Sequence, residues 1–543
     1  MKIAIAQLDP VVGAVQDNTQ KILSAYEEAC RGGARVCITP ELSLFGYPAH
    51  DLLDRPEIFE KNEAALEELK KATRGKKCAL VVGHVSRNPE PTGKAAQNTL
   101  SVLDDGKEAH RQSKHLLPTY DVFDEARYFE PGKELKLWTC DGKKVGFAIC
   151  EDLWAAAPKS ETEAQKRKLY QDDPVDLLAK LKPELLITIS ASPYEQGKLK
   201  LREELHSKIA KRLKCELVYV NQTGATDEII FDGGSFWVDA QGVVQGRLAP
   251  FETVLSYVEQ GQKPKALDET TMLAQALVTG IASYFKRTGF NKAILGLSGG
   301  IDSAVVAALA VKALGPKNVL GVAMPSHFSS SHSLEDAEAL AKNLGIKLEV
   351  QPIKFSFIAL LRQLSENRGG KLLPVAEENM QARLRGVMLM TLSNHEGSLV
   401  LTTGNKSELA MGYCTLYGDM VGALAPIGDL YKTRVYELAR TINQIWGPTI
   451  PLRSIEKAPS AELRPNQTDQ DSLPPYEKLD PVLKAYLEDH VSAQTLAEQN
   501  GDWVKSVLRI LELNEYKRRQ AAPVLKVSPK AFGIGRRIPI AKK

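Results

Sequence analysis

Three reactive side chains lie in the N-terminal part of the sequence, each beside a run that predicts a β-strand. They are Glu41 in TPELSLFGYP, Lys114 in RQSKHLLPTYDVFDE and Cys150 in GFAICEDLW. Nucleophilic cleavage of an amide needs a group deprotonated as it attacks, a cationic donor for the oxyanion, and an acid for the departing ammonia. Cys150, Lys114 and Glu41 supply these groups. Taken singly, each also has an ordinary explanation, as a buried cysteine, a solvated lysine, and a capping or ion-paired glutamate.

A second chemical motif is LGLSGGIDSA, residues 295–304, where a predicted strand runs directly into a predicted helix. Glycines allow backbone N–H groups to approach an anion, Ser298 and Ser303 add hydroxyl donors, and the helix begins with its positive dipole end. The GK[ST] ending of kinase and GTPase loops is missing. The motif therefore predicts a pyrophosphate cradle rather than a site for transfer of a terminal phosphate. A glycine turn capped by Ser and Asp explains the turn but not the whole motif.

Alternating strands and helices must position both motifs. Residues 1–250 alternate β-branched runs such as KIAIAQL and ELLITIS with helical patterns, which predicts an α/β domain. Residues 251–268 lose this periodicity and gain Pro, Gly and charge, so we predict a linker there. Residues 269–543 form a second predicted α/β unit, with a loop beyond residue 465, two helices and a basic tail.

Length and composition exclude several classes of protein. The chain has 543 residues, of which 43% are hydrophobic and 25% charged, as expected for two or more globular domains. A net charge of +3 is too small to favour nucleic acid as a partner. No signal-length or membrane-length apolar run is present, so we expect neither secretion nor membrane insertion. Seven cysteines without a CxxC pair favour reduced thiols and a cytoplasmic location.

The segments around Glu41, Lys114 and Cys150 together resemble the nitrilase, or carbon-nitrogen hydrolase, superfamily. The resemblance covers residues 1 to about 250 and implies a four-layer αββα sandwich. It also implies that Glu41 is the general base, Lys114 the oxyanion donor and Cys150 the nucleophile that forms a thioester. Glu125 in VFDEARYF lies where related enzymes keep an auxiliary acid near the lysine, although a surface ion pair with Arg127 explains it as well.

Similarity to the glutaminase members of that superfamily implies glutamine as the substrate. The residues implied in glutamine binding are Tyr47, Tyr120, Glu125, Ser192 and Lys198. Ordinary packing and surface charge explain Tyr47 and Lys198 equally well. The segment from Ala155 to about Asp176 is longer than usual for bacterial relatives.

SGGxDS resembles the motif of the ATP pyrophosphatases, and the later blocks of the chain resemble the NAD synthetases among them. These blocks are MPSHFSSSHSLEDAEALAKNLGI, ENMQARLRGVMLM, LTTGNKSELAMGYCTLYGDM and KAPSAEL, which recur in the expected order. The resemblance implies a Rossmann-like parallel-sheet domain. It implies ATP contacts from Gly296, Leu297, Ser298, Gly299, Gly300, Ile301, Asp302, Ser303, Thr403, Lys432 and Ser460. It implies deamido-NAD contacts from Asn379, Arg383, Glu408, Tyr413, Cys414, Thr415, Leu416 and Lys526.

Asp302 and Glu408 are implied as a carboxylate pair for Mg²⁺ bound with ATP. Glu408 also fits a helix capping box that needs no metal, and Arg383 and Lys432 fit solvated helix faces. Taken together, the two resemblances imply a homo-oligomer, built on dimers or larger, that releases ammonia from glutamine and uses it in the ATP-dependent amidation of deamido-NAD. Two alternatives stay open: an amidotransferase with another acceptor, and a binding protein that has lost catalysis.

Overall fold

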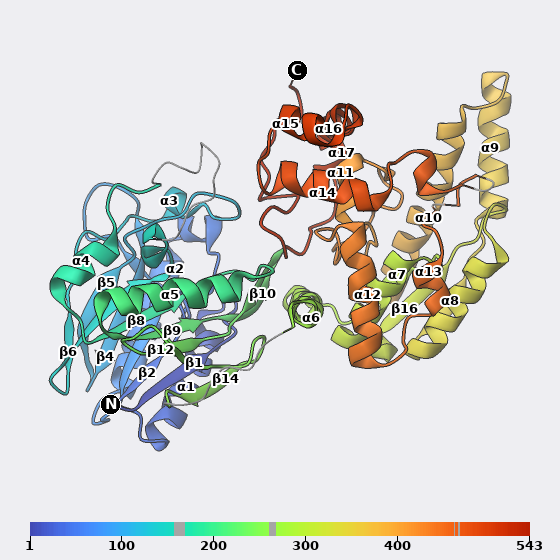
Figure 1. The fold of residues 1–543 in the computed structure, drawn as a ribbon. Coiled ribbons are helices and arrows are strands. Elements are labelled where there is room, and N and C mark those ends of the chain that lie inside the picture. Colours follow the sequence, from blue (N-terminus) through green and yellow to red (C-terminus); the bar gives the residue numbers. More distant parts are fainter. Residues whose placement is uncertain (157–168, 260–267, 461, 465–466, 543) are drawn as a thin grey trace. The chain divides into compact units, whose positions relative to one another are not determined.

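The computed structural model describes residues 1–156, 169–259, 268–460, 462–464 and 467–542 (Figure 1). The chain divides into two compact units, Met1–Leu267 and Asp268–Lys543. Among the described residues, no helix combines the length and apolar character that a membrane span requires.

Two six-stranded sheets form the centre of the first unit. The order in the first sheet is β14-β1-β2-β3-β4-β5, with β1 (Ile3–Gln7), β2 (Val36–Ile38), β3 (Ala79–Arg87), β4 (Ala96–Asp104), β5 (Lys107–Ser113) and β14 (Val254–Tyr257). The order in the second is β13-β12-β9-β8-β7-β6, with β6 (Trp138–Cys140), β7 (Lys143–Ile149), β8 (Leu185–Ser190), β9 (Glu216–Asn221), β12 (Phe236–Val238) and β13 (Val244–Arg247). A separate ribbon pairs β10 (Thr223–Thr226) with β11 (Ile229–Asp232).

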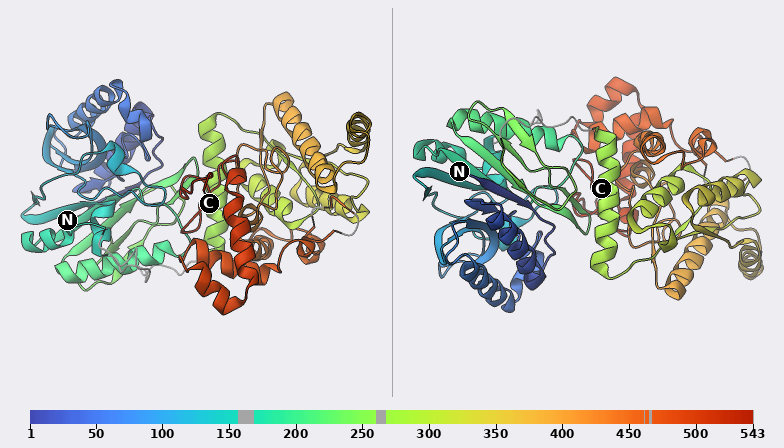
Figure 2. Two further views of the ribbon diagram at one scale, coloured as in Figure 1. Left: turned by 90° about the horizontal axis from the view of Figure 1, so that it is seen from above. Right: turned by 90° about the horizontal axis from the view of Figure 1, so that it is seen from below.

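Alternation along the strands explains why the two sheets stack. In β2, Val36 and Ile38 point into a core shared with Phe147 and Ile187 of the second sheet, whereas Cys37 belongs to the core on the outer face. Helices α1 (Val15–Arg31) and α2 (Glu57–Ala72) pack on that outer face, and α4 (Pro174–Leu181) and α5 (Lys198–Leu213) cover the outer face of the second sheet. Figure 2 shows these helix pairs on opposite outer sides of the sheets. The predicted αββα sandwich is confirmed.

Part of the range predicted as a linker is structured. Strand β14 pairs antiparallel with β1 along Ala4–Gln7, so the first sheet extends through Tyr257. The loss of periodicity that suggested a linker reflects an edge strand whose four residues are all only partly buried. Residues 260–267 of that range lie outside the described residues.

A four-stranded parallel sheet forms the centre of the second unit, which confirms the predicted Rossmann-like arrangement. Its order is β17-β16-β15-β18, with β15 (Ala293–Gly296), β16 (Val319–Ala323), β17 (Lys347–Val350) and β18 (Leu399–Val400). The helices around it are α6 (Glu269–Thr288), α7 (Ile301–Leu314), α8 (Ser331–Leu344), α9 (Lys354–Arg368), α10 (Pro374–Glu396), α11 (Lys406–Met411), α12 (Lys432–Trp446) and α13 (Leu452–Glu456).

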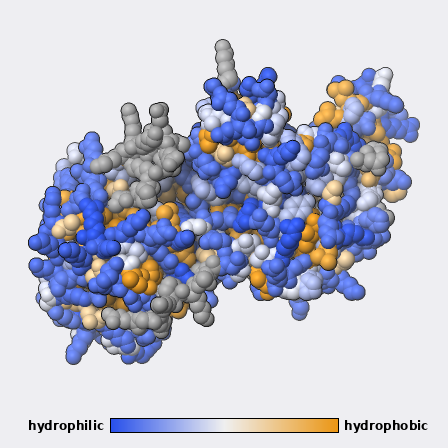
Figure 3. Space-filling model, viewed as in Figure 1, coloured by the Kyte–Doolittle hydropathy of each residue, from blue (hydrophilic) through white to orange (hydrophobic). Residues whose placement is uncertain are grey.

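Residues 467–542, the described part of the chain beyond residue 465, contain four α-helices rather than the two predicted. They are α14 (Tyr476–Leu487), α15 (Ala493–Asn500), α16 (Trp503–Leu513) and α17 (Glu515–Arg518). Gly501 ends α15 directly before α16, a break too short to change the hydrophobic pattern. Figure 3 shows hydrophobic residues gathered over α9, where Phe355 is 80% exposed and Ile358 49% exposed.

Candidate active sites

A buried lysine in the first unit joins two carboxylates from different loops. Nζ of Lys114, one residue after β5, donates to Oε1 of Glu41 at 2.7 Å and to Oε1 of Glu125 at 2.8 Å. Glu125 also accepts from the Tyr47 hydroxyl at 2.9 Å. All four side chains are buried, so the alternative of a surface ion pair between Glu125 and Arg127 is wrong. The structure thus brings together four of the residues singled out in the sequence.

Electrostatics at this cluster keep the lysine charged. Burial alone would lower the pKa of Lys114, but the charges of Glu125 and Glu41 hold it well above its ordinary value. Burial and the nearby Glu41 raise the pKa of Glu125 to about 7, although Lys114 opposes them. Two carboxylates on one ammonium leave the cluster with an excess of negative charge, so Glu125 can hold a proton near neutral pH.

Glu41 is fixed by two further donors that the sequence did not reveal. The Asn98 side-chain amide donates to Oε1 at 2.8 Å, and the backbone N–H of Ala191 donates to Oε2 at 2.7 Å. Asn98 lies in β4 and Ala191 directly after β8, so both sheets orient this carboxylate. An amide in a strand and a backbone N–H carry no motif, and only tertiary structure identifies them.

Cys150 lies directly after β7 and begins the 3-10 helix η2 (Cys150–Ala156). Its φ of 45° is in the left-handed region, which is sparsely populated for residues with a Cβ and is often found at functional sites. Burial and the charge of Glu41 raise the pKa of the Cys150 thiol well above its ordinary value, and Lys114 opposes this. The resting thiol is therefore protonated, and attack on an amide requires a base such as Glu41.

Asp152 holds the turn after Cys150 against the turn after Lys114. Its Oδ1 accepts from the backbone N–H groups of His115 and Leu116 at 2.9 Å, and its Oδ2 accepts from that of Ile149 at 3.0 Å. The side chain is fully buried. Asp152 thereby fixes the turn that carries Cys150 relative to the turn that follows Lys114, a contact that the sequence analysis missed.

A second buried carboxylate, Glu151, directly follows Cys150. It accepts hydrogen bonds from the hydroxyls of Tyr120 and Tyr170, each at 2.9 Å. Burial raises the pKa of Glu151, and the charges of Lys114 and Lys198 counteract this in part. Nζ of Lys198 lies 5.8 Å from the centroid of a Trp154 ring. Of the residues implied in glutamine binding, Tyr120 and Lys198 thus lie around a carboxylate that was not singled out.

The loop that carries Ser192 is held by a network of buried side chains. Oδ1 of Asn221 accepts from the Ser192 N–H at 2.8 Å. Arg202 forms a fully buried ion pair with Asp232 at 2.9 Å and donates to the Pro193 carbonyl at 2.8 Å. The segment predicted to be unusually long runs from Ala155 to Asp176. Its residues 157–168 are not among those that the structure describes.

In the second unit, residues 297–300 form the turn between β15 and α7 that the glycine motif predicts. Gly299 has a φ of 77°, and a Cβ there would lie 2.3 Å from the Ser333 carbonyl oxygen, so only glycine fits. The Gly300 N–H donates to Oγ of Ser298 at 3.2 Å, and the Ser303 hydroxyl donates to the Gly300 carbonyl at 3.0 Å. Ser298 is exposed and lies in the loop just before α7, a helix of 14 residues.

Asp302 and Glu408 meet at the ammonium of Lys432. Nζ of Lys432 forms an ion pair with Asp302 and lies 3.5 Å from Oε1 of Glu408. Asn405 and Glu408 also form a capping box at the start of α11, so the capping explanation holds alongside the ion pair. Burial and the charge of Asp302 raise the pKa of Glu408 to about 8, against the effect of Lys432. The site therefore has an excess of negative charge.

That excess fits a divalent cation bound by two carboxylates together with phosphate oxygens, the usual arrangement for Mg²⁺. Among the described residues, no group of three or more His, Cys, Asp or Glu side chains could hold a metal by itself. Asp302 and Glu408 are the residues that would hold Mg²⁺ when ATP supplies the other oxygens. Thr403 lies half-buried in the loop between β18 and α11.

The residues implied in deamido-NAD binding fall into two groups. One surrounds Thr415, whose hydroxyl donates to Oδ1 of Asn379 at 2.8 Å and whose N–H donates to Asp419 at 2.6 Å. Beside it, Nε of Arg383 donates to the Leu416 carbonyl at 3.1 Å. Cys414, Glu408 and Asp419 line one cavity. The Tyr413 hydroxyl accepts from Gln467 at 3.2 Å. In contrast, Lys526 is buried and donates to the Ser528 carbonyl at 2.6 Å.

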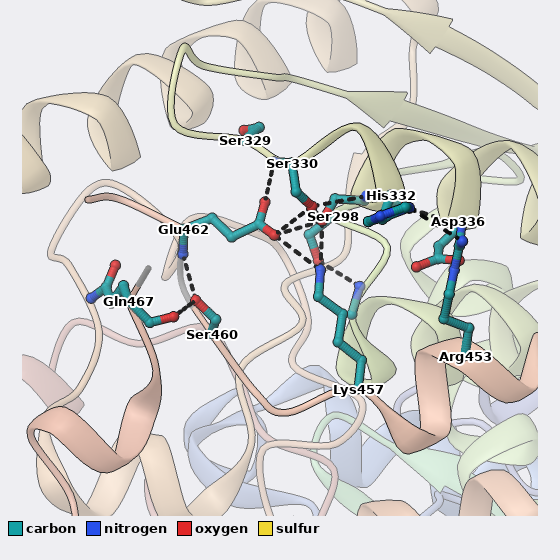
Figure 4. A network of polar contacts seen from close by, with 12 residues as sticks. Ser298, Ser329, Ser330, His332, Asp336, Arg453, Lys457, Ser460, Glu462 and Gln467 are labelled. Carbon is teal, nitrogen blue, oxygen red and sulfur yellow. Dashed lines mark hydrogen bonds and ion pairs between the residues drawn. The ribbon is translucent and has the colours of Figure 1, made fainter. Parts of the chain in front are cut away.

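Ser460 lies in a segment held to α8 by a network that Figure 4 shows. Oγ of Ser460 accepts from the Glu462 N–H at 3.2 Å. The Glu462 carboxylate accepts from Oγ of Ser333 at 2.6 Å, from Oγ of Ser330 at 3.2 Å and from Nζ of Lys457 at 2.9 Å. Neither Lys457 nor Glu462 was singled out in the sequence, although both flank Ser460 in KAPSAEL.

Comparison with known proteins gives a consistent result for the two units. Residues 2–260 match the carbon-nitrogen hydrolase family, and residues 273–521 match the NAD synthase family. The glutamine-dependent NAD(+) synthetase of Synechocystis sp. is 45% identical, over 99% of this chain and 98% of that protein. The one from Thermotoga maritima is 39% identical, over 100% and 99% respectively.

Solved structures agree over the full length. Glutamine-dependent NAD+ synthetase from Acinetobacter baumannii, in complex with adenosine diphosphate, has a TM-score of 0.78 and 37% identity, over 99% of this chain and 98% of that chain. A glutamine-dependent NAD(+) synthetase from Cytophaga hutchinsonii has a TM-score of 0.84 over 100% and 98%. At 20% identity, this second likeness shows the fold alone.

Proposed function

The chain belongs to the family of glutamine-dependent NAD(+) synthetases, and from this premise we propose a role for each unit. The first unit hydrolyses glutamine, and the second uses the ammonia to amidate deamido-NAD⁺ with ATP, forming NAD⁺, AMP, pyrophosphate and glutamate. The observation that carries the proposal is that one chain combines the buried Glu41, Lys114 and Cys150 cluster with the glycine loop beside Asp302, Glu408 and Lys432.

For the first unit, the contacts support a thioester mechanism. Glu41 accepts the proton of the Cys150 thiol as the sulfur attacks the side-chain amide carbon of glutamine. The Lys114 ammonium, which stays charged, donates to the oxyanion of the tetrahedral intermediate. Protonated Glu41 then gives its proton to the departing ammonia, and water hydrolyses the glutamyl thioester with Glu41 again as base.

Glutamine is favoured because the site offers a charge for each end of an amino acid. Glu151 is a buried carboxylate suited to the α-ammonium group, and Lys198 is a cation suited to the α-carboxylate. Glu151 is close enough to Cys150 to contribute to the raised pKa of its thiol, and Lys198 is close enough to Glu151 to counteract the rise in the pKa of that carboxyl. We propose that Tyr120, bonded to Glu151, orients it toward the substrate.

For the second unit, the glycine loop and Lys432 support cleavage between the α- and β-phosphates. Backbone N–H groups of residues 298–300 and the start of α7 bind the β- and γ-phosphates, and Lys432 neutralises charge on the departing pyrophosphate. Mg²⁺, when bound with ATP by Asp302 and Glu408, neutralises further charge on the triphosphate. A carboxylate oxygen of the nicotinate attacks the α-phosphorus of ATP and expels pyrophosphate, which leaves an acyl adenylate. Ammonia then attacks the carboxyl carbon of this adenylate, loses a proton and displaces AMP.

We also infer a cytoplasmic location and a homo-oligomer. All seven cysteines are free, as expected in a reducing compartment. Phe355, Ile358 and Leu373 are 80%, 49% and 73% exposed, and such apolar side chains commonly become buried between copies of a chain. Light scattering after gel filtration tests this: a monomer at micromolar concentration contradicts the oligomer.

An acceptor-dependent pyrophosphate assay tests the proposed function. The purified chain is mixed with Mg-ATP, either glutamine or ammonium chloride, and one of three acceptors: deamido-NAD⁺, xanthosine monophosphate or aspartate. We expect stoichiometric pyrophosphate and AMP with deamido-NAD⁺ only, and with either nitrogen source. Turnover with another acceptor would favour a different amidotransferase, and no turnover with any acceptor would favour a protein without catalysis.

A further inference from the structure

Lys457 is a cation close to the glycine loop, and the carboxylate of Glu462 neutralises its charge. Its Nζ bonds to Oγ of Ser333 at 2.7 Å and to Glu462 at 2.9 Å. Ser333 is also the residue whose carbonyl would meet a Cβ on Gly299 at 2.3 Å, so its backbone packs directly on the loop. Ser333 therefore contacts both Lys457 and the glycine loop, so a single residue separates Lys457 from the proposed phosphate cradle. Figure 4 shows Lys457, Glu462 and Ser298 grouped in this way.

The Glu462 carboxylate takes the bonds that a phosphate oxygen would take. One oxygen accepts from Lys457, Ser330 and Ser333, and the other lies 3.4 Å from the Ser330 N–H at the start of α8. Although burial alone would raise it, hydrogen bonds from Ser333 and Lys457 hold the pKa of Glu462 below its ordinary value. The carboxylate is therefore ionised at neutral pH, and it competes with any other anion for these donors.

Two features favour exchange of the Glu462 carboxylate for another anion. Glu462 has a φ of 49°, in the left-handed region that costs energy for a residue with a Cβ, so the carboxylate bonds must offset backbone strain. Lys457 and Glu462 are also 31% and 20% exposed, so solvent and ligands can reach the pair. An accessible ion pair contributes little net stability, so replacing it by another anion costs little.

We propose that Glu462 is a latch that occupies Lys457 while no nucleotide is bound, and that phosphate oxygens of the substrate replace its carboxylate on Lys457. Resting on the proposed function, this adds Lys457 as a phosphate-contacting residue and Glu462 as a positioning residue that opposes binding. The exchange swaps one anion for another on the same donors, so it needs no covalent step.

Equilibrium binding tests the latch. Inorganic pyrophosphate and α,β-methylene ATP, each with Mg²⁺, are titrated into the full chain by calorimetry. Replacing Glu462 by neutral glutamine frees Lys457 and removes the competing anion. Glu462→Gln should tighten both dissociation constants by about three- to tenfold, as expected when a dominant incompetent state is removed. It should also lower the KM for ATP in ammonium-supported synthesis, which a merely structural substitution would raise or leave unchanged.

Two further variants assign the effect to Lys457. Lys457→Met should weaken pyrophosphate binding by about tenfold, and adding Glu462→Gln to it should restore little of this loss, because the two residues act on each other. Glu349→Gln is a matched control, since Glu349 is 23% exposed and pairs with Lys347 far from the loop in sequence. It should leave both constants unchanged.

The outcomes separate the latch from the proposed function. If the unmodified chain binds the probes and turns over but Glu462→Gln binds no tighter, the latch is wrong and the function stands. A gain that persists in the double variant also overturns it, because Lys457 would then not be the group released. If the unmodified chain binds neither probe and releases no pyrophosphate, the proposed function itself fails. Thermal unfolding of each variant shows whether a loss of binding reflects loss of fold.

Discussion

One ammonium that serves two buried carboxylates gives the first unit an unusual pH dependence. The folded chain raises the pKa of Glu125 from 4.5 to about 7, so between these values it binds a proton that the unfolded chain has released. Stability from this group is present below pH 4.5 and decreases as pH rises to about 7. The substitution Glu125→Gln keeps an oxygen acceptor for Lys114 and Tyr47, and its side chain does not titrate.

Glu125→Gln should therefore gain stability relative to the unmodified chain as pH rises. We expect the difference in unfolding free energy to grow by about 1–3 kcal/mol between pH 5 and pH 7.5. Urea denaturation at several pH values measures it, with Glu216→Gln, at a half-exposed ion pair, as the control. Parallel stability curves for Glu125→Gln and the unmodified chain would show that Glu125 titrates normally.

Glu151 provides a test of substrate recognition at the same scale. Loss of its charge should raise the KM for glutamine by about 10- to 100-fold, because a charge-assisted bond to the α-ammonium group is lost. Ammonium-supported synthesis should be unaffected by Glu151→Gln, since that reaction does not use the first unit. Steady-state kinetics with both nitrogen sources measure this. An unchanged KM for glutamine would remove Glu151 from the binding site.

Sequence and structure agree best on residues whose chemistry is visible in their type and position. Glu41, Lys114 and Cys150 each follow a strand, and stacked sheets bring strand ends together, so their grouping could be predicted. Asn98 and Asp152 could not, because each acts through a contact between distant segments and stands in no recognisable motif. The same holds for Lys457 and Glu462, whose pairing with α8 depends on tertiary structure.

At the scale of elements, Asp152 joins the turn after β7 to the turn after β5. Asp152→Ala removes a carboxylate that accepts three backbone N–H groups and leaves those donors buried. We expect a loss of about 2–4 kcal/mol in stability and at least a tenfold loss of glutaminase rate. Asp239→Ala is the control, because Asp239 accepts from two backbone N–H groups and from the side-chain amide of Gln245, in a partly exposed turn of the same unit. Equal effects of the two variants would contradict a positioning role.

A second element-scale contact involves Lys406 at the start of α11. Its fully buried ammonium pairs with Asp429 at 2.9 Å and Glu488 at 2.6 Å and donates to the Ser528 hydroxyl at 2.7 Å. It therefore connects α11, α14 and the C-terminal segment, an arrangement that no local pattern predicts because a buried lysine looks like any other in sequence.

Lys406→Met leaves two carboxylates buried without their cation. Breaking a buried pair in this way should cost about 3–5 kcal/mol. Proteolysis of the full chain should begin in the second unit, while the first unit keeps its resistance. Lys505→Met, at an exposed ion pair with Asp502, serves as the control. Unchanged proteolysis of Lys406→Met would show that this network adds nothing to stability.

At the scale of the whole molecule, two units with different chemistry lie in one chain. The strand and helix pattern predicted two α/β units, and the family resemblances carried by the motifs implied the αββα sandwich and the parallel sheet. The boundary could not be placed as well, because β14 lacks the apolar alternation of a core strand. The full-length similarity to known synthetases extends across both units, which supports a coupled reaction in which ammonia from one supplies the other.

The division of labour between the units is the central claim, and one measurement tests it directly. NAD⁺ formation by Cys150→Ala is followed with glutamine and, separately, with ammonium chloride. Without the thiol no glutamyl thioester can form, so glutamine-supported synthesis should fall by about 10³-fold or more, while the ammonium-supported rate stays within about twofold of the unmodified chain. Equal loss with both nitrogen donors, or synthesis from glutamine at the unmodified rate, would contradict the account.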